Sequence, residues 1–174
     1  MKQHYLKAIA LGSYEDVRAL AHGVKDLNPV ACQVTAKALA RAITAMPESK
    51  NAVLVPMPGH SDDRNAMVRL TRMVSELSGI DYSPDYLKAA SHKSLYAWKK
   101  EHPGEAPPEV LILENGREIQ PGKTPILIDN VLDTGHTAWA ALEAMSQKPV
   151  MVVVGATGNH GRYGRDVSLE VDTG

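Results

Sequence analysis

Short apolar runs in this chain alternate with longer segments in which apolar residues recur every three or four positions. The apolar runs lie at residues 52–57, 110–113, 126–128 and 150–154, and polar residues, Pro or Gly bound them. Continuous runs of this length that are rich in Val, Ile and Leu predict strands buried on both faces. Because predicted strands alternate with predicted helices, the pattern indicates an α/β domain with a mostly parallel sheet flanked by helices.

Helix signals are clearest in the first third of the chain. Ser13 with Asp16 three residues later is the capping-box pattern of a helix start, and Gly23 is the expected stop of that helix. Asn28 is the expected cap of a second helix, which keeps an apolar face up to Pro47.

The remaining chain contains two further helical patterns and two segments without one. Ser61, Asp62 and Asp63 are expected in the first turn of a helix that ends before Gly79, and apolar spacing over 138–145 predicts another helix. Residues 5–11 form a strand or a hairpin arm in this interpretation. Residues 91–108 are polar and basic with three prolines, and a connection of that length is usually functional or disordered.

Composition narrows the classes of protein that this chain can belong to. With 174 residues and 44% hydrophobic residues, it is the size of one domain with a sizeable core. A net charge of −1 disfavours a nucleic-acid-binding surface, and no run of about 18 apolar residues predicts a membrane span. A single cysteine, Cys32, excludes an internal disulfide and a multi-cysteine zinc site. Because Cys32 lies among alanines, we expect it to be buried. We therefore expect a cytoplasmic protein that binds neither nucleic acid nor membranes.

The most informative chemistry follows the apolar run at 126–128. Asp129 and Asn130 are expected at the carboxyl end of a strand, and residues 133–137 form a small-residue turn that enters the next helix. Backbone N–H groups at a helix start favour an anion, and Gly135 lets the backbone approach it closely. The pattern predicts a sugar-phosphate site, although a strand-to-helix turn capped by Asp133 and Thr134 would leave the same pattern.

Residues 126–137 resemble the phosphoribosyl diphosphate (PRPP) signature of type I phosphoribosyltransferases. That signature is an apolar strand, two acidic residues, two mostly apolar residues and a Thr-Gly-x-Thr type loop, and Asn130 departs from it by replacing the second carboxylate. The resemblance implies the type I phosphoribosyltransferase core and a ribose site formed by Asp129 and Asn130. The 5-phosphate would then be held by Asp133, Thr134, Gly135, His136 and Thr137.

Asp133 adds a resemblance to one branch of this family. An Asp-Thr-Gly loop at this place is similar to the 6-oxopurine branch of the family, which implies that Asp133 is the catalytic acid/base partner of the purine ring. The same resemblance implies Mg²⁺ as cofactor, bound mainly to oxygens of PRPP, with Asp129 as its protein ligand directly or through water.

The segment after the first core strand is the expected pyrophosphate site. Its Val-Pro-x-Pro pattern, followed by Arg64, is similar to ComF-type and amidophosphoribosyltransferase-like members. Backbone groups of Gly59 and His60 and the side chain of Arg64 would suit a diphosphate. A plain Pro-Gly turn with a surface arginine is the alternative.

The basic stretch lies where the family keeps its flexible catalytic loop. Lys93, Lys99 and Lys100 are the candidates to add positive charge over pyrophosphate. The alternative is a solvated surface loop with Tyr96 and Trp98 packed beneath it or onto a partner subunit.

The glycine-rich segment at 154–161 looks like a dinucleotide-binding turn. We reject that interpretation, because such a site needs a following helix, a further strand and an acidic residue about 20 positions on. In the resembled fold this loop lies beside the nucleobase pocket, so backbone groups of residues 158–161 or Tyr163 could contact the base. A glycine-rich surface loop is the favoured interpretation.

The sequence thus predicts a single domain over residues 1–174, with a PRPP-binding core at 52–154 and an N-terminal hood at 1–50. The predicted activity transfers phosphoribosyl from PRPP to a nucleobase or related nitrogen acceptor with release of pyrophosphate. The alternative is a non-catalytic PRPP- or nucleotide-binding regulator, or a ComF-like protein. A homodimer that buries the helix of Trp139 or residues 96–98 is a further hypothesis.

Overall fold

The structure is a computed structural model that describes residues 5–59, 65–91, 93–115, 119–160 and 166–172. Its main sheet has five strands in the order β2-β5-β6-β1-β7, and every pair is parallel. The strands are β1 (Tyr5–Ser13), β2 (Ala52–Pro56), β5 (Thr124–Leu132), β6 (Val150–Ala156) and β7 (Asp166–Val171). The expected α/β domain with a parallel sheet flanked by helices is confirmed.

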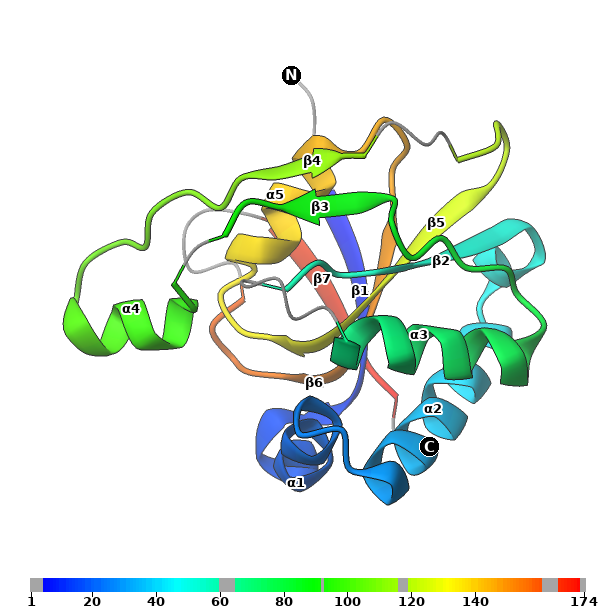
Figure 1. The fold of residues 1–174 in the computed structure, drawn as a ribbon, viewed down its shortest axis with the longest axis horizontal. Helices are drawn as coiled ribbons and strands as arrows, with labels where there is room; N and C mark the ends of the chain where they lie inside the picture. The colour runs from blue at the N-terminus through cyan, green and yellow to red at the C-terminus, as the bar shows by residue number, and fades with distance from the viewer. Residues whose placement is uncertain (1–4, 60–64, 92, 116–118, 161–165, 173–174) are drawn as a thin grey trace.

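A smaller antiparallel sheet and six helical segments complete the described chain. The sheet pairs β3 (Leu87–Ala89) with β4 (Ile112–Glu114). The helices are α1 (Tyr14–Lys25), α2 (Pro29–Thr44), the 3-10 turn η1 (Pro47–Asn51), α3 (Asn65–Ser78), α4 (Leu95–Glu101) and α5 (His136–Ala144). Figure 1 shows α1, α2 and α3 on one side of the main sheet, with α5 and the β3–β4 pair on the other.

The sheet separates two hydrophobic cores. One contains Ile126, Ile128 and buried residues of α2 and α3, and the other contains Leu127 and buried residues of α5. Neighbouring strand residues point to opposite faces, so a strand with helices on both sides must be apolar throughout. This is why the apolar runs at 126–128 and 150–154 predict strands correctly.

The N-terminal segment contributes a strand to the main sheet. β1 lies between β6 and β7, and Leu6, Ala8 and Ala10 are fully buried in its core. The segment carries the alternating pattern of a strand, and its central place comes from pairing with β6, which a local pattern cannot show. Residues 5–44 are therefore part of the main sheet and of its helical layer.

The helix caps agree with the sequence, but one expected stop is wrong. The Oγ of Ser13 accepts from the backbone N–H of Asp16 at 3.3 Å, and the Oδ1 of Asn28 accepts from that of Ala31 at 3.0 Å. Gly23 lies inside α1, which continues to Lys25. A Cβ at Gly23 would lie 2.5 Å from the Cβ of Ala31, so this glycine lets α1 and α2 approach closely instead of ending a helix.

Two further expectations need correction. Residues 110–113 do not form a buried core strand, because β4 belongs to the small antiparallel sheet and Leu111 and Leu113 are exposed. The stretch at 91–108 contains a helix, α4, which the Oγ of Ser94 caps by accepting from the N–H of Ala97. Trp139 is 2% exposed in the core of its own chain, and a homodimer that buries another face of its helix stays a prediction.

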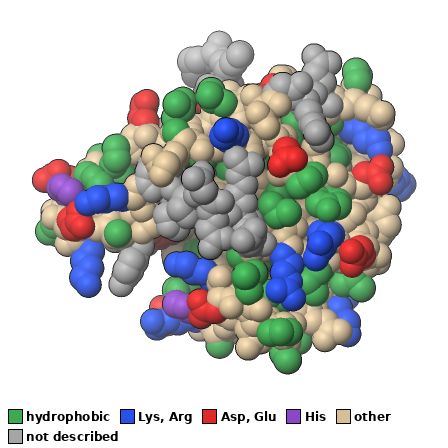
Figure 2. Space-filling view, in the orientation of Figure 1, with side chains coloured by type: hydrophobic (Ala, Val, Ile, Leu, Met, Phe, Trp, Pro, Cys, Tyr) green, Lys and Arg blue, Asp and Glu red, His purple; other side chains and the backbone are tan. Residues whose placement is uncertain are grey.

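The surface is mixed in character. Figure 2 shows acidic and basic side chains interspersed over the part of this face that the structure describes. Cys32 is buried, as expected. None of the helices in the described ranges has the length and apolar character that a membrane crossing requires.

Candidate functional site

The helices that follow the neighbouring parallel strands β2 and β5 leave the sheet on opposite faces. α3, which follows β2, packs its buried Leu70 and Val74 on one face, whereas α5, which follows β5, packs Ala138 and Trp139 on the other. Helices that leave neighbouring strands on opposite faces open a crevice beyond the carboxyl ends of those strands, and ligands of open α/β sheets bind there. The candidate site is therefore the region beyond β2 and β5, together with the adjoining end of β6.

Asp129 lies near the end of β5, which continues three residues further than Asp129 itself. Its Oδ1 accepts the backbone N–H of Asn130 at 2.7 Å. Burial raises the pKa of the Asp129 carboxyl to about 6, and the hydrogen bond from Asn130 opposes that rise only in part. A hard carboxylate oxygen that ionises near neutral pH fits the donor chemistry of Mg²⁺.

The side chain of Asn130 makes a hydrogen bond on the face of the sheet that α1 covers. Its Nδ2 donates to the carbonyl oxygen of Ala21 in α1 at 2.8 Å, and its Oδ1 is buried without a hydrogen-bond partner among the described residues. Because the partner is a carbonyl, this position needs a donor, which a carboxylate cannot supply. A ribose-binding role for Asn130 would require this bond to be given up.

The turn after β5 has the backbone that an anion site needs. Gly135 has a φ of 82°, a left-handed conformation that favours glycine, and it precedes α5 without a capping side chain. The first N–H groups of α5 thus lack a side-chain cap. Thr134 is buried, and Thr137 is half-buried in the first turn of the helix.

His136 does not point freely into solvent. Its Nε2 lies 2.9 Å from the carbonyl oxygen of Pro108, to which it donates in the matching tautomer. This contact ties the start of α5 to the segment that leads away from α4. His136 therefore connects the turn after β5 with the basic stretch.

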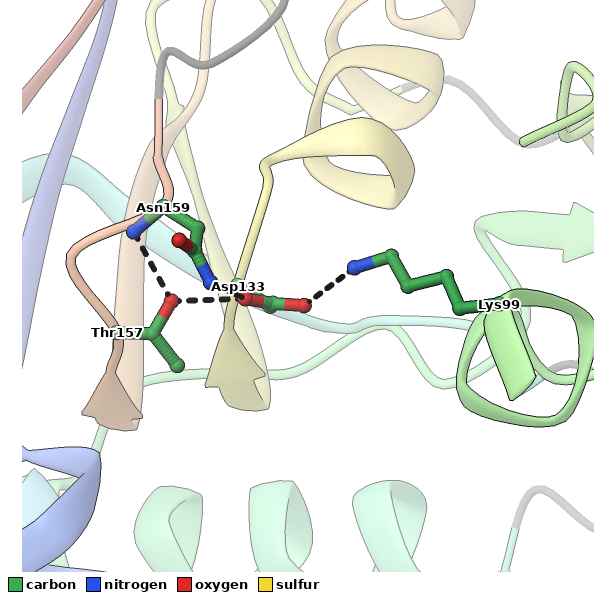
Figure 3. Close-up of polar contacts among 4 residues, drawn as sticks. All are labelled: Lys99, Asp133, Thr157 and Asn159. Carbon is green, nitrogen blue, oxygen red and sulfur yellow. Dashed lines mark hydrogen bonds and ion pairs between the residues drawn. The ribbon is translucent and has the colours of Figure 1, made fainter. Parts of the chain in front are cut away.

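Asp133 is the centre of a polar network that joins the turn after β5, the loop after β6 and the helix α4 (Figure 3). Its Oδ1 accepts from the Oγ1 of Thr157 at 2.8 Å and from the Nδ2 of Asn159 at 2.9 Å, and its Oδ2 accepts from the Nζ of Lys99 at 2.8 Å. Burial by itself would raise the pKa of Asp133, but the hydrogen bonds from Lys99, Asn159 and Thr157 outweigh burial and hold the pKa below its ordinary value. The carboxyl group is accordingly ionised at neutral pH.

The other two candidate lysines lie outside this network. Lys93 is exposed and makes an ion pair with Glu101 at 2.9 Å, within the α4 segment. Lys100 is exposed on α4. Of the three lysines, the structure brings Lys99 alone to the turn after β5.

The expected pyrophosphate segment is described only in part. Gly59 is half-buried and lies just beyond β2, at the same edge of the sheet as Asp133. His60 and Arg64 lie outside the described residues, as does Tyr163.

No group of three or more His, Cys, Asp or Glu side chains suited to a metal occurs in the described ranges. A shallow depression on the helical layer is lined by Lys37, Ala40, Arg41, Thr44 and Leu77. These residues belong to the C-terminal halves of α2 and α3, which lead toward the amino-terminal edge of the sheet. The depression therefore lies away from the candidate site.

Neither a protein-family model nor a curated protein matches this chain. Among solved structures, the chain is similar to an adenine phosphoribosyltransferase from Leishmania donovani, with 21% sequence identity and a TM-score of 0.49. The match covers 90% of this chain and 68% of that chain. A similarity this low assigns no role to any residue.

Thr157 and Asn159 are site residues that the sequence interpretation missed. It assigned only backbone groups of the glycine-rich segment to a ligand. Both side chains come directly after β6, and the backbone N–H of Thr157 donates to the carbonyl of Leu132 at the end of β5. The signal was present, since polar residues just beyond a buried parallel strand lie at the edge where such sheets bind ligands.

Proposed function

We propose that this protein is a phosphoribosyltransferase that binds PRPP beyond β2 and β5 and transfers its phosphoribosyl group to a nitrogen acceptor, with a nucleobase as the expected acceptor. One observation carries the proposal. The PRPP-like run at 126–137 covers the end of β5, the turn after it and the start of α5, at the place where α3 and α5 leave the sheet on opposite faces. Ligands of open α/β sheets bind at such a crevice.

The residues divide the work between binding and proton transfer. The uncapped start of α5 would hold the 5-phosphate through the N–H groups that follow Gly135, and Asp129 would accept from a ribose hydroxyl. Asp133, at the same edge, would take the proton from the acceptor nitrogen. The new bond joins that nitrogen to C1 of the ribose, while the bond from C1 to pyrophosphate breaks and pyrophosphate leaves with the electron pair.

Mg²⁺ fits this site as a partner of the substrate. Asp129 provides one hard oxygen donor, and the ion would complete its coordination with PRPP oxygens and water. Bound in this way, Mg²⁺ would neutralise charge on the leaving pyrophosphate.

A regulator that binds PRPP without turning it over is the second candidate. The observation in its favour is the hydrogen bond from Asn130 to Ala21, which leaves Asp129 as the one carboxylate of the pair. A site in which Asp129 is the one carboxylate and the Asn130 amide is already bonded to Ala21 can still bind PRPP without catalysing transfer.

Calorimetric titration with PRPP tests binding, with and without Mg²⁺. We expect Mg²⁺-dependent binding that Asp129→Ala weakens about tenfold or more, the usual magnitude for a hydrogen bond to a charged group. Asp81→Ala is the matched control, because this exposed aspartate lies outside the candidate site. Absence of PRPP binding in the wild-type protein would refute the proposed function.

Pyrophosphate release with a panel of nucleobases then separates the two candidates. Release triggered by one base establishes the transferase and identifies its acceptor. Binding of PRPP without release for any base supports the regulator.

A further inference from the structure

The two carboxylate oxygens of Asp133 have partners of different kinds (Figure 3). Oδ1 is held by Thr157 and Asn159, in the loop that directly follows the buried strand β6. Oδ2 is held by Lys99, which belongs to α4. Because the first two partners follow a core strand, they can keep the carboxylate in place when Lys99 leaves.

α4 reaches the candidate site through Lys99. Figure 1 shows it at the margin of the molecule, away from the main sheet. Several of its contacts are internal: Lys93 pairs with Glu101 at 2.9 Å, and the rings of Trp98 and His102 stack with centroids 4.4 Å apart. The bond from Lys99 to Asp133 therefore joins a marginal helix to the candidate site.

The ion pair between Lys99 and Asp133 is easily exchanged. Their side chains are 33% and 41% exposed, and pairs this open to water contribute little to stability. A lysine makes a stronger charge-assisted hydrogen bond to a multiply charged phosphate oxygen. The expected diphosphate position, just beyond β2, lies at the same edge of the sheet as Asp133.

We propose that Lys99 exchanges its hydrogen bond to Asp133 for one to the diphosphate of the incoming ligand, an exchange that we call the handover. In the free protein, Lys99 blocks Oδ2 and Asp133 cannot act as a base. In the bound protein, Lys99 contacts the anion and Oδ2 is open to a proton, while Thr157 and Asn159 hold Oδ1 as positioning residues. The handover rests on the proposed function, since it regulates the same site.

A double-mutant cycle tests the handover, with calorimetry of Mg²⁺-pyrophosphate binding to the wild type, Lys99→Met, Asp133→Asn and the double variant. We expect Lys99→Met to weaken binding about tenfold, because it removes a charge-assisted hydrogen bond. We expect Asp133→Asn to tighten binding about two- to fivefold, because it removes the competitor for Lys99. In the Lys99→Met background, Asp133→Asn should have almost no effect.

Lys50→Met, an exposed lysine that precedes β2, is the matched control and should bind like the wild type. Equal tightening by Asp133→Asn in both backgrounds would mean plain charge repulsion and would overturn the handover. Weaker binding of Asp133→Asn would overturn it as well, because Asp133 would then be holding Lys99 ready for the anion. A wild type that does not bind pyrophosphate also overturns the handover. The proposed function is decided separately, by the PRPP titration.

Discussion

Asp129 carries a part-buried carboxyl whose ionisation should be visible in stability. Its pKa is about 6 in the folded protein, against an ordinary value of about 3.9 in an unfolded chain. The folded state therefore binds the proton more tightly. The stabilisation is fully present below about pH 4 and is lost as the pH rises through 6.

The predicted size of this loss is about 2 to 3 kcal/mol. Urea unfolding of the wild type and Asp129→Asn at pH 4 and pH 8 measures it, because the asparagine variant lacks the titrating group while sharing the others. The wild type should lose this much more free energy of unfolding than the variant between the two pH values. Parallel losses would show that folding does not raise the pKa of the Asp129 carboxyl.

Asn130 explains why the second carboxylate of the resembled signature is missing here. Its amide donates to the Ala21 carbonyl, and an ionised carboxylate would place two acceptors against each other. We predict that Asn130→Asp lowers the free energy of unfolding at pH 7 by about 2 kcal/mol or more, although it restores the family pattern.

The sign of the pH effect identifies the cause of this loss. In the Asn130→Asp variant, the new carboxyl group could again donate to Ala21 once it is protonated, so the loss should shrink at pH 4. Chemical denaturation at both pH values measures it. A variant as stable as the wild type at pH 7 would argue against the contact with α1.

At the scale of elements, the packing of α1 on α2 depends on one glycine. Exchanging Gly for Ala inside a helix usually stabilises it by about 1 kcal/mol. At Gly23 we predict the opposite sign, a loss of about 1 to 3 kcal/mol, because the new Cβ would lie 2.5 Å from that of Ala31.

A double variant that exchanges the residues at positions 23 and 31 provides the control for Gly23→Ala. Combining Gly23→Ala with Ala31→Gly removes the clash and should recover part of the loss, as thermal or urea unfolding would show. If the double variant is less stable than the sum of the single variants predicts, steric contact between α1 and α2 is not the cause.

The elements also show where local patterns were sufficient. The caps of α1 and α2 depend on residues three apart, so the sequence predicted both correctly. α4 was missed because three prolines and several charges dominate the surrounding stretch, although Ser94 is an ordinary cap. β7 was missed because its alternation is that of a half-exposed edge strand.

At the scale of the whole molecule, the topology predicts which residues a bound ligand protects from amide hydrogen exchange. With PRPP and Mg²⁺ bound, amide hydrogen exchange should slow in residues 129–137 and 157–160, beyond neighbouring parallel strands. Residues 37–44, which line the depression on the helical layer, should exchange at an unchanged rate. Protection of 37–44 instead would place the ligand at the wrong edge of the sheet.

The sequence by itself determined the kind and order of most elements and the PRPP-like run, because periodicity, caps and turn residues act over a few neighbouring positions. Only the tertiary structure decided that β1 lies between β6 and β7, and that Asp133 meets Thr157, Asn159 and Lys99. These partners lie between 24 and 34 positions from Asp133 along the chain. Strand order and loop docking place them together, and both depend on which surfaces bury one another once the chain is compact.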